Sequence, residues 1–141
     1  MISKIYLGLG SNLGDRKENL ACAIRLIGER VGKVLRVSSL IETEPWGFES
    51  KNKFLNAVIC CETKLTPRQV LRATQQIERE LGRRKCHSTK RQKEINYQDR
   101  PIDIDILLYD DLIVDEPDLK IPHPLMQQRD FVMIPLNEIK D

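Results

Sequence analysis

The sequence is poor in aromatic residues, with only 5% Phe, Trp and Tyr, and it contains no long apolar run. No segment approaches the roughly 20 consecutive apolar residues that cross a bilayer. The first residues, Met1 to Leu9, lack the basic region and the cleavage site of a signal peptide. These absences argue against a membrane-spanning protein and against a secreted one.

Paired cysteines are absent as well. The four cysteines are Cys22, Cys60, Cys61 and Cys86, and none of them forms a Cys-x-x-Cys pair. Cys60 and Cys61 are adjacent, so on a strand they would point to opposite faces. We therefore expect neither a zinc site nor a disulfide framework, and reduced thiols indicate a cytoplasmic location.

A large net charge is also missing. Lys and Arg number 23 against 21 Asp and Glu, a balance of +2 that gives no case for a nucleic-acid partner. The basic residues are nevertheless concentrated in one segment. Between positions 83 and 100 lie Arg83, Arg84, Lys85, Lys90, Arg91, Lys93 and Arg100, opposed only by Glu94 and Asp99. This segment is a local cationic patch.

What remains is an ordinary globular composition, 40% hydrophobic and 31% charged in a chain of 141 residues. A chain of this length supports one core but not two, so we expect a single domain, 1–141. Ile2 to Leu9 predicts a strand that runs into a turn with capping chemistry at Gly10-Ser11-Asn12. A helix should follow, with Asp15 near its start and Gly32 at its end; its apolar positions are Leu20, Ile24, Ile27 and Val31.

Two further strands are predicted at Val34–Ile41 and Phe54–Glu62, separated by a loop that contains Pro45-Trp46-Gly47. The next helix carries the clearest signals. Thr66 is the expected N-cap, Gln69 completes a capping box, and Gly82 is the expected end.

From Arg83 to Gln98 the sequence has no apolar period, which predicts a long exposed loop. Ile102 to Tyr109 then predicts a strand, and Phe131 to Ile139 is a last apolar segment. The order of strand, helix, strand, strand, helix, strand is that of an α+β, ferredoxin-like split βαβ sandwich with a mainly antiparallel sheet. Enzymes and RNA-binding modules share this fold, so the fold alone does not decide the function.

The strand from Ile102 carries two carboxylates on one face. Asp103 and Asp105 are two residues apart, so their side chains leave the sheet about 7 Å apart, close enough to flank hard cations. An acidic pair that follows a basic loop indicates Mg²⁺ and a nucleoside triphosphate. The alternatives are a solvated sheet face and a solvated loop. The run Gly8 to Asn12 lacks the dinucleotide and P-loop patterns, and we interpret it as a capped turn.

Four segments together resemble the 6-hydroxymethyl-7,8-dihydropterin pyrophosphokinase family. They are Gly10-Ser11-Asn12-Leu13-Gly14-Asp15, Phe54-Leu55-Asn56-Ala57, Arg100-Pro101-Ile102-Asp103-Ile104-Asp105-Ile106-Leu107, and Ile121-Pro122-His123-Pro124 followed by Arg129 and Phe131. The resemblance spans nearly the whole chain. It implies Mg²⁺-dependent transfer of diphosphate from ATP to a reduced pterin, with release of AMP, as a step of folate biosynthesis.

The resemblance also implies roles for individual residues. Asp103 and Asp105 would hold two Mg²⁺ ions, and with Arg83 and Arg100 would form the catalytic set. The ATP site would comprise Gln75, Glu78, Arg83, Lys85, Arg100, Ile106, His123 and Arg129. The pterin site would comprise Thr43, Pro45, Trp46, Gly47, Phe54, Asn56, Tyr97 and Phe131, with Phe54 and Phe131 on either side of the ring.

Each implied role has a structural alternative. Phe54 and Phe131 could be core residues, His123 a loop histidine, and Gln75 and Glu78 part of a solvated helix face. The rival function is a non-enzymatic RNA-binding module of the same fold. The sequence lacks the aromatic platform of such modules, and Asp103 and Asp105 would repel a phosphate backbone. We therefore expect small-molecule substrates, no nucleic-acid or membrane partner, and a monomer.

Overall fold

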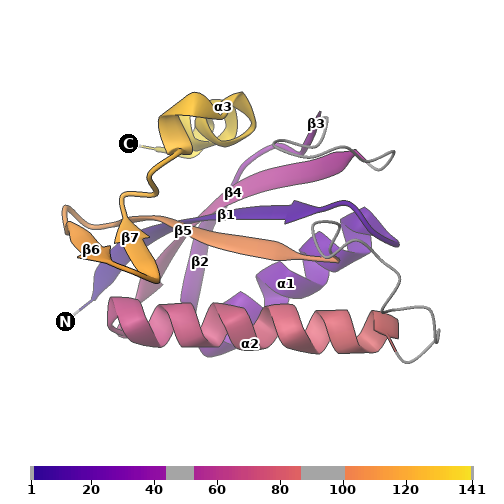
Figure 1. Ribbon diagram of the computed structural model, residues 1–141, viewed down its shortest axis with the longest axis horizontal. Coiled ribbons are helices and arrows are strands. Elements are labelled where there is room, and N and C mark those ends of the chain that lie inside the picture. The colour runs from indigo at the N-terminus through magenta and orange to yellow at the C-terminus, as the bar shows by residue number, and fades with distance from the viewer. Residues whose placement is uncertain (1, 44–52, 87–100, 141) are drawn as a thin grey trace.

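The computed structural model describes residues 2–43, 53–86 and 101–140 (Figure 1). Its strands are β1 (Ser3–Ser11), β2 (Gly32–Val37), β3 (Ile41–Thr43), β4 (Phe54–Thr63), β5 (Asp103–Tyr109), β6 (Val114–Glu116) and β7 (Leu119–Ile121). Its helices are α1 (Arg16–Arg30), α2 (Pro67–Cys86), the short 3-10 helix η2 (Met126–Gln128) and α3 (Asp130–Ile139).

The main sheet has five antiparallel strands in the order β2-β4-β1-β5, and β3 pairs with β4 beyond the end of β2. This is the order of a ferredoxin-like split βαβ sheet, so the predicted fold class is confirmed. β6 and β7 form a separate two-stranded hairpin that the sequence did not predict. β5 lies at one edge of the main sheet, with β1 as its only strand partner among the described residues.

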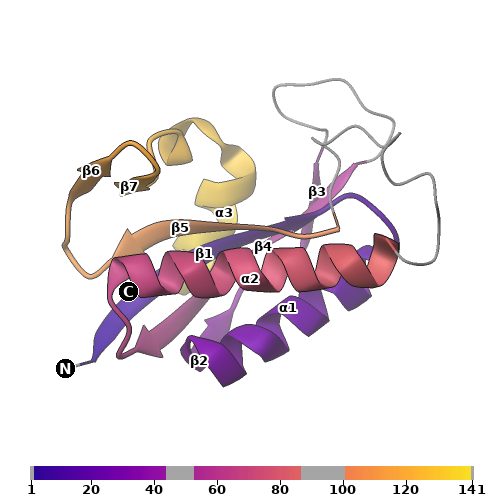
Figure 2. The same ribbon diagram turned by 60° about the horizontal axis from the view of Figure 1, so that its bottom comes forward.

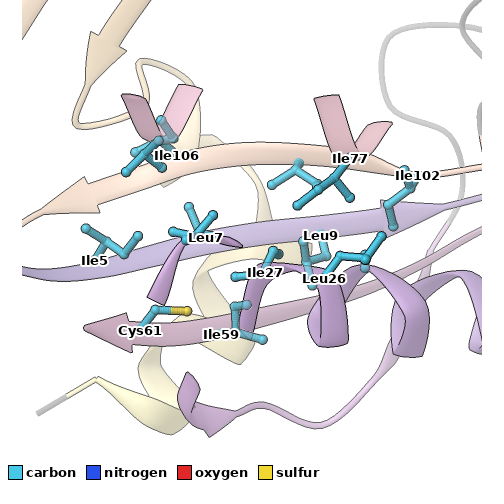
Figure 3. Packing of buried hydrophobic residues seen from close by; sticks show 14 of the residues in the cluster. Ile5, Leu7, Leu9, Leu26, Ile27, Ile59, Cys61, Ile77, Ile102 and Ile106 are labelled. Atoms are coloured by element: carbon cyan, nitrogen blue, oxygen red, sulfur yellow. The ribbon is translucent and has the colours of Figure 1, made fainter. Parts of the chain in front are cut away.

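Helices α1 and α2 cover one face of the sheet, and α3 lies over the other (Figures 1 and 2). The larger core fills the space between the sheet and the helix pair, where strand residues such as Ile5, Leu7 and Ile59 meet Ile27 and Ile77 (Figure 3). Because these five side chains are fully buried, each stabilises the fold by about 1.5–3 kcal/mol relative to an exposed position.

The second core lies under α3, where Val132 and Leu136 pack against Val58, Cys60 and Leu107 of the sheet; Tyr6, Met126 and Ile139 complete it. Both faces of the sheet are therefore covered at this level. Cys60 belongs to this core and Cys61 to the other one, as their adjacent positions predicted. Burial raises the pKa of the Cys61 thiol to about 12, which keeps it protonated and unreactive.

The start of α2 follows the predicted capping chemistry, whereas the cap of α1 is Asp15 and not the predicted turn at Gly10-Ser11-Asn12. Asp15 caps α1 by accepting a 3.1 Å hydrogen bond from the Glu18 amide. Thr66 and Gln69 bond each other reciprocally at the start of α2, at 2.9 and 3.2 Å, which confirms the capping box. Ser11, in contrast, is the last residue of β1 and does not belong to a turn that caps α1.

One predicted helix end is confirmed and one needs correction. α1 ends at Arg30 with Val31 as its C-cap, so Gly32 directly follows the helix, as predicted, and is the first residue of β2. Glycine is required there because a Cβ would lie 1.8 Å from the carbonyl oxygen of Glu62. α2 does not stop at Gly82 but continues to Cys86, so the segment from Arg83 begins as helix and not as loop.

Candidate functional site

The candidate site is built on three neighbouring strands, on the face of the sheet that carries α3. Gly10 of β1 is registered with Asn56 of β4 on one side and with Asp103 of β5 on the other. Two residues earlier on β1, Gly8 is registered with Val58 of β4 and with Asp105 of β5. Registered partners share a face. Adjacent strands are about 4.8 Å apart, so Asn56 and Asp103 stand roughly 10 Å apart across Gly10.

Gly10 has no side chain, so its backbone forms the floor of the site between the side chains of Asn56 and Asp103. A Cβ at this position would lie 3.0 Å from Asn56 Oδ1 and 3.3 Å from Phe54 Cδ1. Asn56 is held in place because its Nδ2 donates a 2.8 Å hydrogen bond to Thr43 Oγ1. Thr43, Phe54 and Asn56, three of the residues predicted for the pterin, therefore lie together on the β3–β4 side of the floor.

Two basic side chains approach the carboxylate side of the floor. His123 Nε2 lies 3.9 Å from Asp105 Oδ1, and Arg129 Nη1 lies 3.9 Å from Asp105 Oδ2. Both distances exceed that of a direct hydrogen bond. The three side chains are only 17–33% exposed, so their charges interact more strongly than they would in bulk water. The predicted ATP residues His123 and Arg129 are therefore brought together with Asp105.

The protonation of His123 follows from its surroundings. Its Nδ1 accepts a 3.3 Å hydrogen bond from the Leu125 amide, so the neutral imidazole carries its proton on Nε2, which faces Asp105. Burial lowers the pKa of His123, as does the charge of Arg129, while Asp103 acts in the opposite direction. His123 therefore presents an N–H donor to the site even when it is uncharged.

Arg129 and Phe131 are linked at the start of α3. The guanidinium carbon of Arg129 lies 5.7 Å from the centre of the Phe131 ring, a cation–π contact. Phe131 is half-buried and packs at the margin of the second core. Its ring is therefore anchored by the core while part of its surface stays accessible.

Helix α2 supplies the other described candidates, but they lie away from the sheet face with the carboxylates. Gln75 is exposed. Glu78 is half-buried, and its Oε2 accepts a 2.7 Å hydrogen bond from the Ile104 amide of β5. Ile106 is buried in the core between the sheet and α1 and α2, so any contact with ATP must come from its main chain.

The remaining predicted residues cannot be placed in the same way. Pro45, Trp46, Gly47, Tyr97 and Arg100 lie outside the described residues. Arg83 and Lys85 lie on the last turn of α2, where the structure describes the helix but not these side chains.

Sequence reasoning missed two features of the site. The first is the floor, because Gly8 and Gly10 were assigned to a strand end and a turn; two glycines at alternating strand positions were the available signal. The second is Arg16, which bonds the Lys53 carbonyl at 3.0 Å and forms a 2.7 Å ion pair with Glu42. Arg16 thus joins β3 to the residue just before β4.

The donor set of the site suits magnesium. Mg²⁺ is typically held by one or two carboxylates together with substrate phosphates, and not by an all-protein cage. Asp103 and Asp105 provide two such carboxylates, and no group of three or more His, Cys, Asp or Glu that could hold a metal occurs among the described residues. Asp103 and Asp105 therefore fit Mg²⁺ in the presence of a polyphosphate.

No helix in the described ranges is long and apolar enough to cross a membrane.

Comparison with known proteins identifies relatives of the chain. Residues 6–141 match the family described as 7,8-dihydro-6-hydroxymethylpterin-pyrophosphokinase (HPPK). The chain is 51% identical over 136 residues to the 2-amino-4-hydroxy-6-hydroxymethyldihydropteridine pyrophosphokinase of Porphyromonas gingivalis, covering 96% of this chain and 89% of that protein. The enzyme of the same description from Aquifex aeolicus is 38% identical over 139 residues, covering 99% and 81%.

Solved structures agree on the fold. The crystal structure of wild-type Plasmodium falciparum HPPK-DHPS superposes with a TM-score of 0.73 at 16% identity, over 98% of this chain and 41% of that chain. At this identity the likeness shows the fold alone, and the chain spans only about two fifths of the longer protein. The family match, in contrast, covers almost all of this chain, and the sequence relatives are matched over most of their own length. The predicted resemblance is thereby confirmed, and the chain belongs to the 7,8-dihydro-6-hydroxymethylpterin-pyrophosphokinase family.

Proposed function

We propose that this chain transfers the diphosphate of ATP to the hydroxymethyl group of 6-hydroxymethyl-7,8-dihydropterin in folate biosynthesis. The pyrophosphokinase activity, with ATP as co-substrate, follows from membership of the family. The observation that best supports this assignment is the row of Asn56, Gly10 and Asp103 across three strands. In this row Asn56, with Phe54 beside it, lies on one side of Gly10, and Asp103 lies on the other side.

The row suggests how the two substrates lie. The pterin ring contacts Phe54 and Asn56 on the β4 side, with Thr43 behind Asn56 and Phe131 supplied by α3. The triphosphate lies over Asp103 and Asp105. The hydroxymethyl group then points across Gly10 toward the phosphates, and the roughly 10 Å between Asn56 and Asp103 leaves room for a bicyclic ring and its substituent.

In the reaction, the pterin hydroxyl oxygen forms a bond to the β-phosphorus of ATP. The bond from that phosphorus to the oxygen bridging it to the α-phosphate breaks, so AMP leaves and the hydroxyl proton is released. Such transfers depend mainly on positioning and on neutralisation of charge. Two Mg²⁺ ions held by Asp103 and Asp105 would supply positive charge to the phosphates and lower the pKa of the hydroxyl.

Protein groups carry out the rest of the charge neutralisation. Arg129 contributes a fixed positive charge. The neutral imidazole of His123 already carries a proton on Nε2 and donates it in a hydrogen bond to a phosphate oxygen, so His123 does not need to be positively charged. We assign Arg83, Lys85 and Arg100 to the same task. Gln75 and the main chain of Ile106 are assigned to the nucleotide, and Pro45, Trp46, Gly47 and Tyr97 to the pterin. We further propose that the chain acts as one domain, as a cytoplasmic monomer.

The assignment is tested by AMP release from ATP and Mg²⁺, with and without 6-hydroxymethyl-7,8-dihydropterin. Release should require the pterin. Asp103→Asn and Asp105→Asn should each lower kcat by at least about 100-fold while the melting temperature stays close to that of the wild type, because both side chains leave the sheet surface. Asp111→Asn, an exposed carboxylate just after β5, is the matched control and should retain activity. Near-native turnover by Asp103→Asn at saturating Mg²⁺ would contradict the metal assignment.

A further inference from the structure

The edge strand β5 is fastened to helix α2 between the two carboxylates. The Ile104 amide, with Asp103 on one side and Asp105 on the other, donates a 2.7 Å hydrogen bond to Glu78 Oε2. Figure 2 shows α2 running alongside β5. The side chains of Ile104 and Ile77, the neighbour of Glu78, are both buried in the larger core. Apolar packing therefore fixes α2 against β5, and Glu78 reaches the edge of the strand from a set position.

The direction of this bond determines where the neighbouring amides point. Along an antiparallel ladder, successive residues turn their main-chain groups alternately toward the partner strand and away from it. The Ile104 amide points away from β1, so the main-chain groups of Asp103 and Asp105 point toward β1, where they are registered with Gly10 and Gly8. The carboxylate pair is thus held by β1 on one side of its strand and by Glu78 on the other.

Glu78 is not placed to be a third metal ligand. Among the described residues no cluster of three or more acidic, His or Cys side chains could hold an ion. Its carboxylate is occupied at the sheet edge, and a charge-assisted bond of this kind is roughly twice as strong as a neutral one. Without it, the Ile104 amide at the edge of the described sheet would lose its partner, and the strand would be free to shift or bulge at the residue between the two carboxylates.

We infer that Glu78 is a positioning residue, which fixes Asp103 and Asp105 relative to the phosphates by anchoring the Ile104 amide. This inference rests on the proposed function, because it assigns a purpose to the placement of the two carboxylates. This role is transmitted through β5 and differs from the expected contact of Glu78 with the nucleoside.

Reach and charge of the Glu78 side chain can be separated by substitution. Glu78→Gln keeps the length and an acceptor oxygen, whereas Glu78→Asp keeps the charge but is one methylene too short. The positioning role predicts that Glu78→Ala and Glu78→Asp lower kcat by about 10- to 100-fold, as expected for a small misplacement of reacting groups. Glu78→Gln should recover most of that loss. Glu80→Ala is the matched control on the same helix, since Glu80 pairs with Arg30 of α1, and it should retain kcat.

A second readout does not depend on activity. In the free protein, amide exchange at Ile104 measured by NMR should be at least about 10-fold faster in Glu78→Asp than in Glu78→Gln, with the β1-facing amide of Asp105 unchanged. The preference for ATP over GTP should be the same in all variants. A changed ATP preference with normal Ile104 exchange would overturn the inference in favour of a nucleoside contact. Faster exchange with unchanged kcat would show that the bond does not position the site.

The same data separate failure of the inference from failure of the proposed function. If the wild type releases no AMP in the presence of pterin, the proposed function fails, whatever the exchange rates are. If the wild type is active and Glu78→Asp equals Glu78→Gln in both kcat and Ile104 exchange, only the positioning role fails. A melting curve for each variant identifies any that do not fold, and the Gln and Asp variants differ from the wild type by too little volume to disturb the packing of α2.

Discussion

The bare floor of the site is tested by Gly10→Ala. The left-handed backbone that favours glycine is found at Gly14 but not at Gly10, so alanine can adopt the local conformation. The added methyl group would lie 3.0 Å from Asn56 Oδ1 and 3.3 Å from Phe54 Cδ1. Both side chains must shift by a few tenths of an ångström, and Asn56 cannot do so without stretching its 2.8 Å bond to Thr43.

The size of the effect follows from these contacts. Overpacking of this kind costs about 1–3 kcal/mol, and replacing glycine by alanine returns about 0.4–1 kcal/mol by restricting the unfolded chain. The net loss of stability should therefore not exceed about 2.6 kcal/mol. The strain falls on Asn56 and Phe54, so pterin affinity should drop by about 5- to 30-fold, which corresponds to roughly 1–2 kcal/mol.

Calorimetry can measure this directly, using the pterin in the presence of Mg²⁺ and a non-hydrolysable ATP analogue, and the analogue by itself. Gly8→Ala is the matched control on the same strand and face. The nearest neighbour of its methyl group would be the Leu107 side chain, at an ordinary 3.4 Å, so pterin affinity should change by less than about threefold. Gly10→Ala with wild-type pterin affinity, or with equal losses for pterin and nucleotide, would refute the assignment of this floor.

Two further predictions concern the side chains around the floor. Phe131→Ala should weaken pterin binding by about 10-fold or more while binding of the ATP analogue changes little, because the pterin ring loses contact area and the nucleotide does not. Equal losses for both ligands in calorimetry would mean that Phe131 acts only as a core residue. The pKa of His123 in the free protein, followed by NMR with His87 as the other histidine signal, should lie below its ordinary value. It should rise in Arg129→Gln, which removes a positive neighbour, and fall further in Asp103→Asn, which removes a negative one. Shifts of the opposite sign would place these charges elsewhere.

Local sequence signals were sufficient for much of the fold. The helix start at Thr66 was predictable because a capping box joins residues three apart in the chain. The alternation from Ile102 was equally reliable, since its isoleucines are buried while Asp103 and Asp105 face the other side.

Prediction failed where a local penalty is outweighed by packing. A glycine costs a helix only about 1 kcal/mol, and α2 continues through Gly82. The segment Phe131–Ile139 was recognised as apolar but not as a helix. It contains Pro135, whose missing amide argues against a helix until the burial of Val132 and Leu136 is known.

The candidate site was predictable in composition but not in arrangement. The acidic pair followed from its spacing, and the remaining roles came from the family resemblance. The row through Gly10 and the bond from Glu78 to the Ile104 amide depend on which strands and helices become neighbours. No periodicity within one segment of the sequence carries that information.

The central position of β1 has a consequence for synthesis of the chain. Until β5 emerges from the ribosome, β1 has β4 on one side and an unpaired edge on the other. A nascent chain that ends before Asp103 therefore exposes an edge rich in aliphatic residues, the kind of surface that chaperones shield and that promotes aggregation. A truncated chain that ends before Asp103 should accordingly aggregate more readily than the full chain.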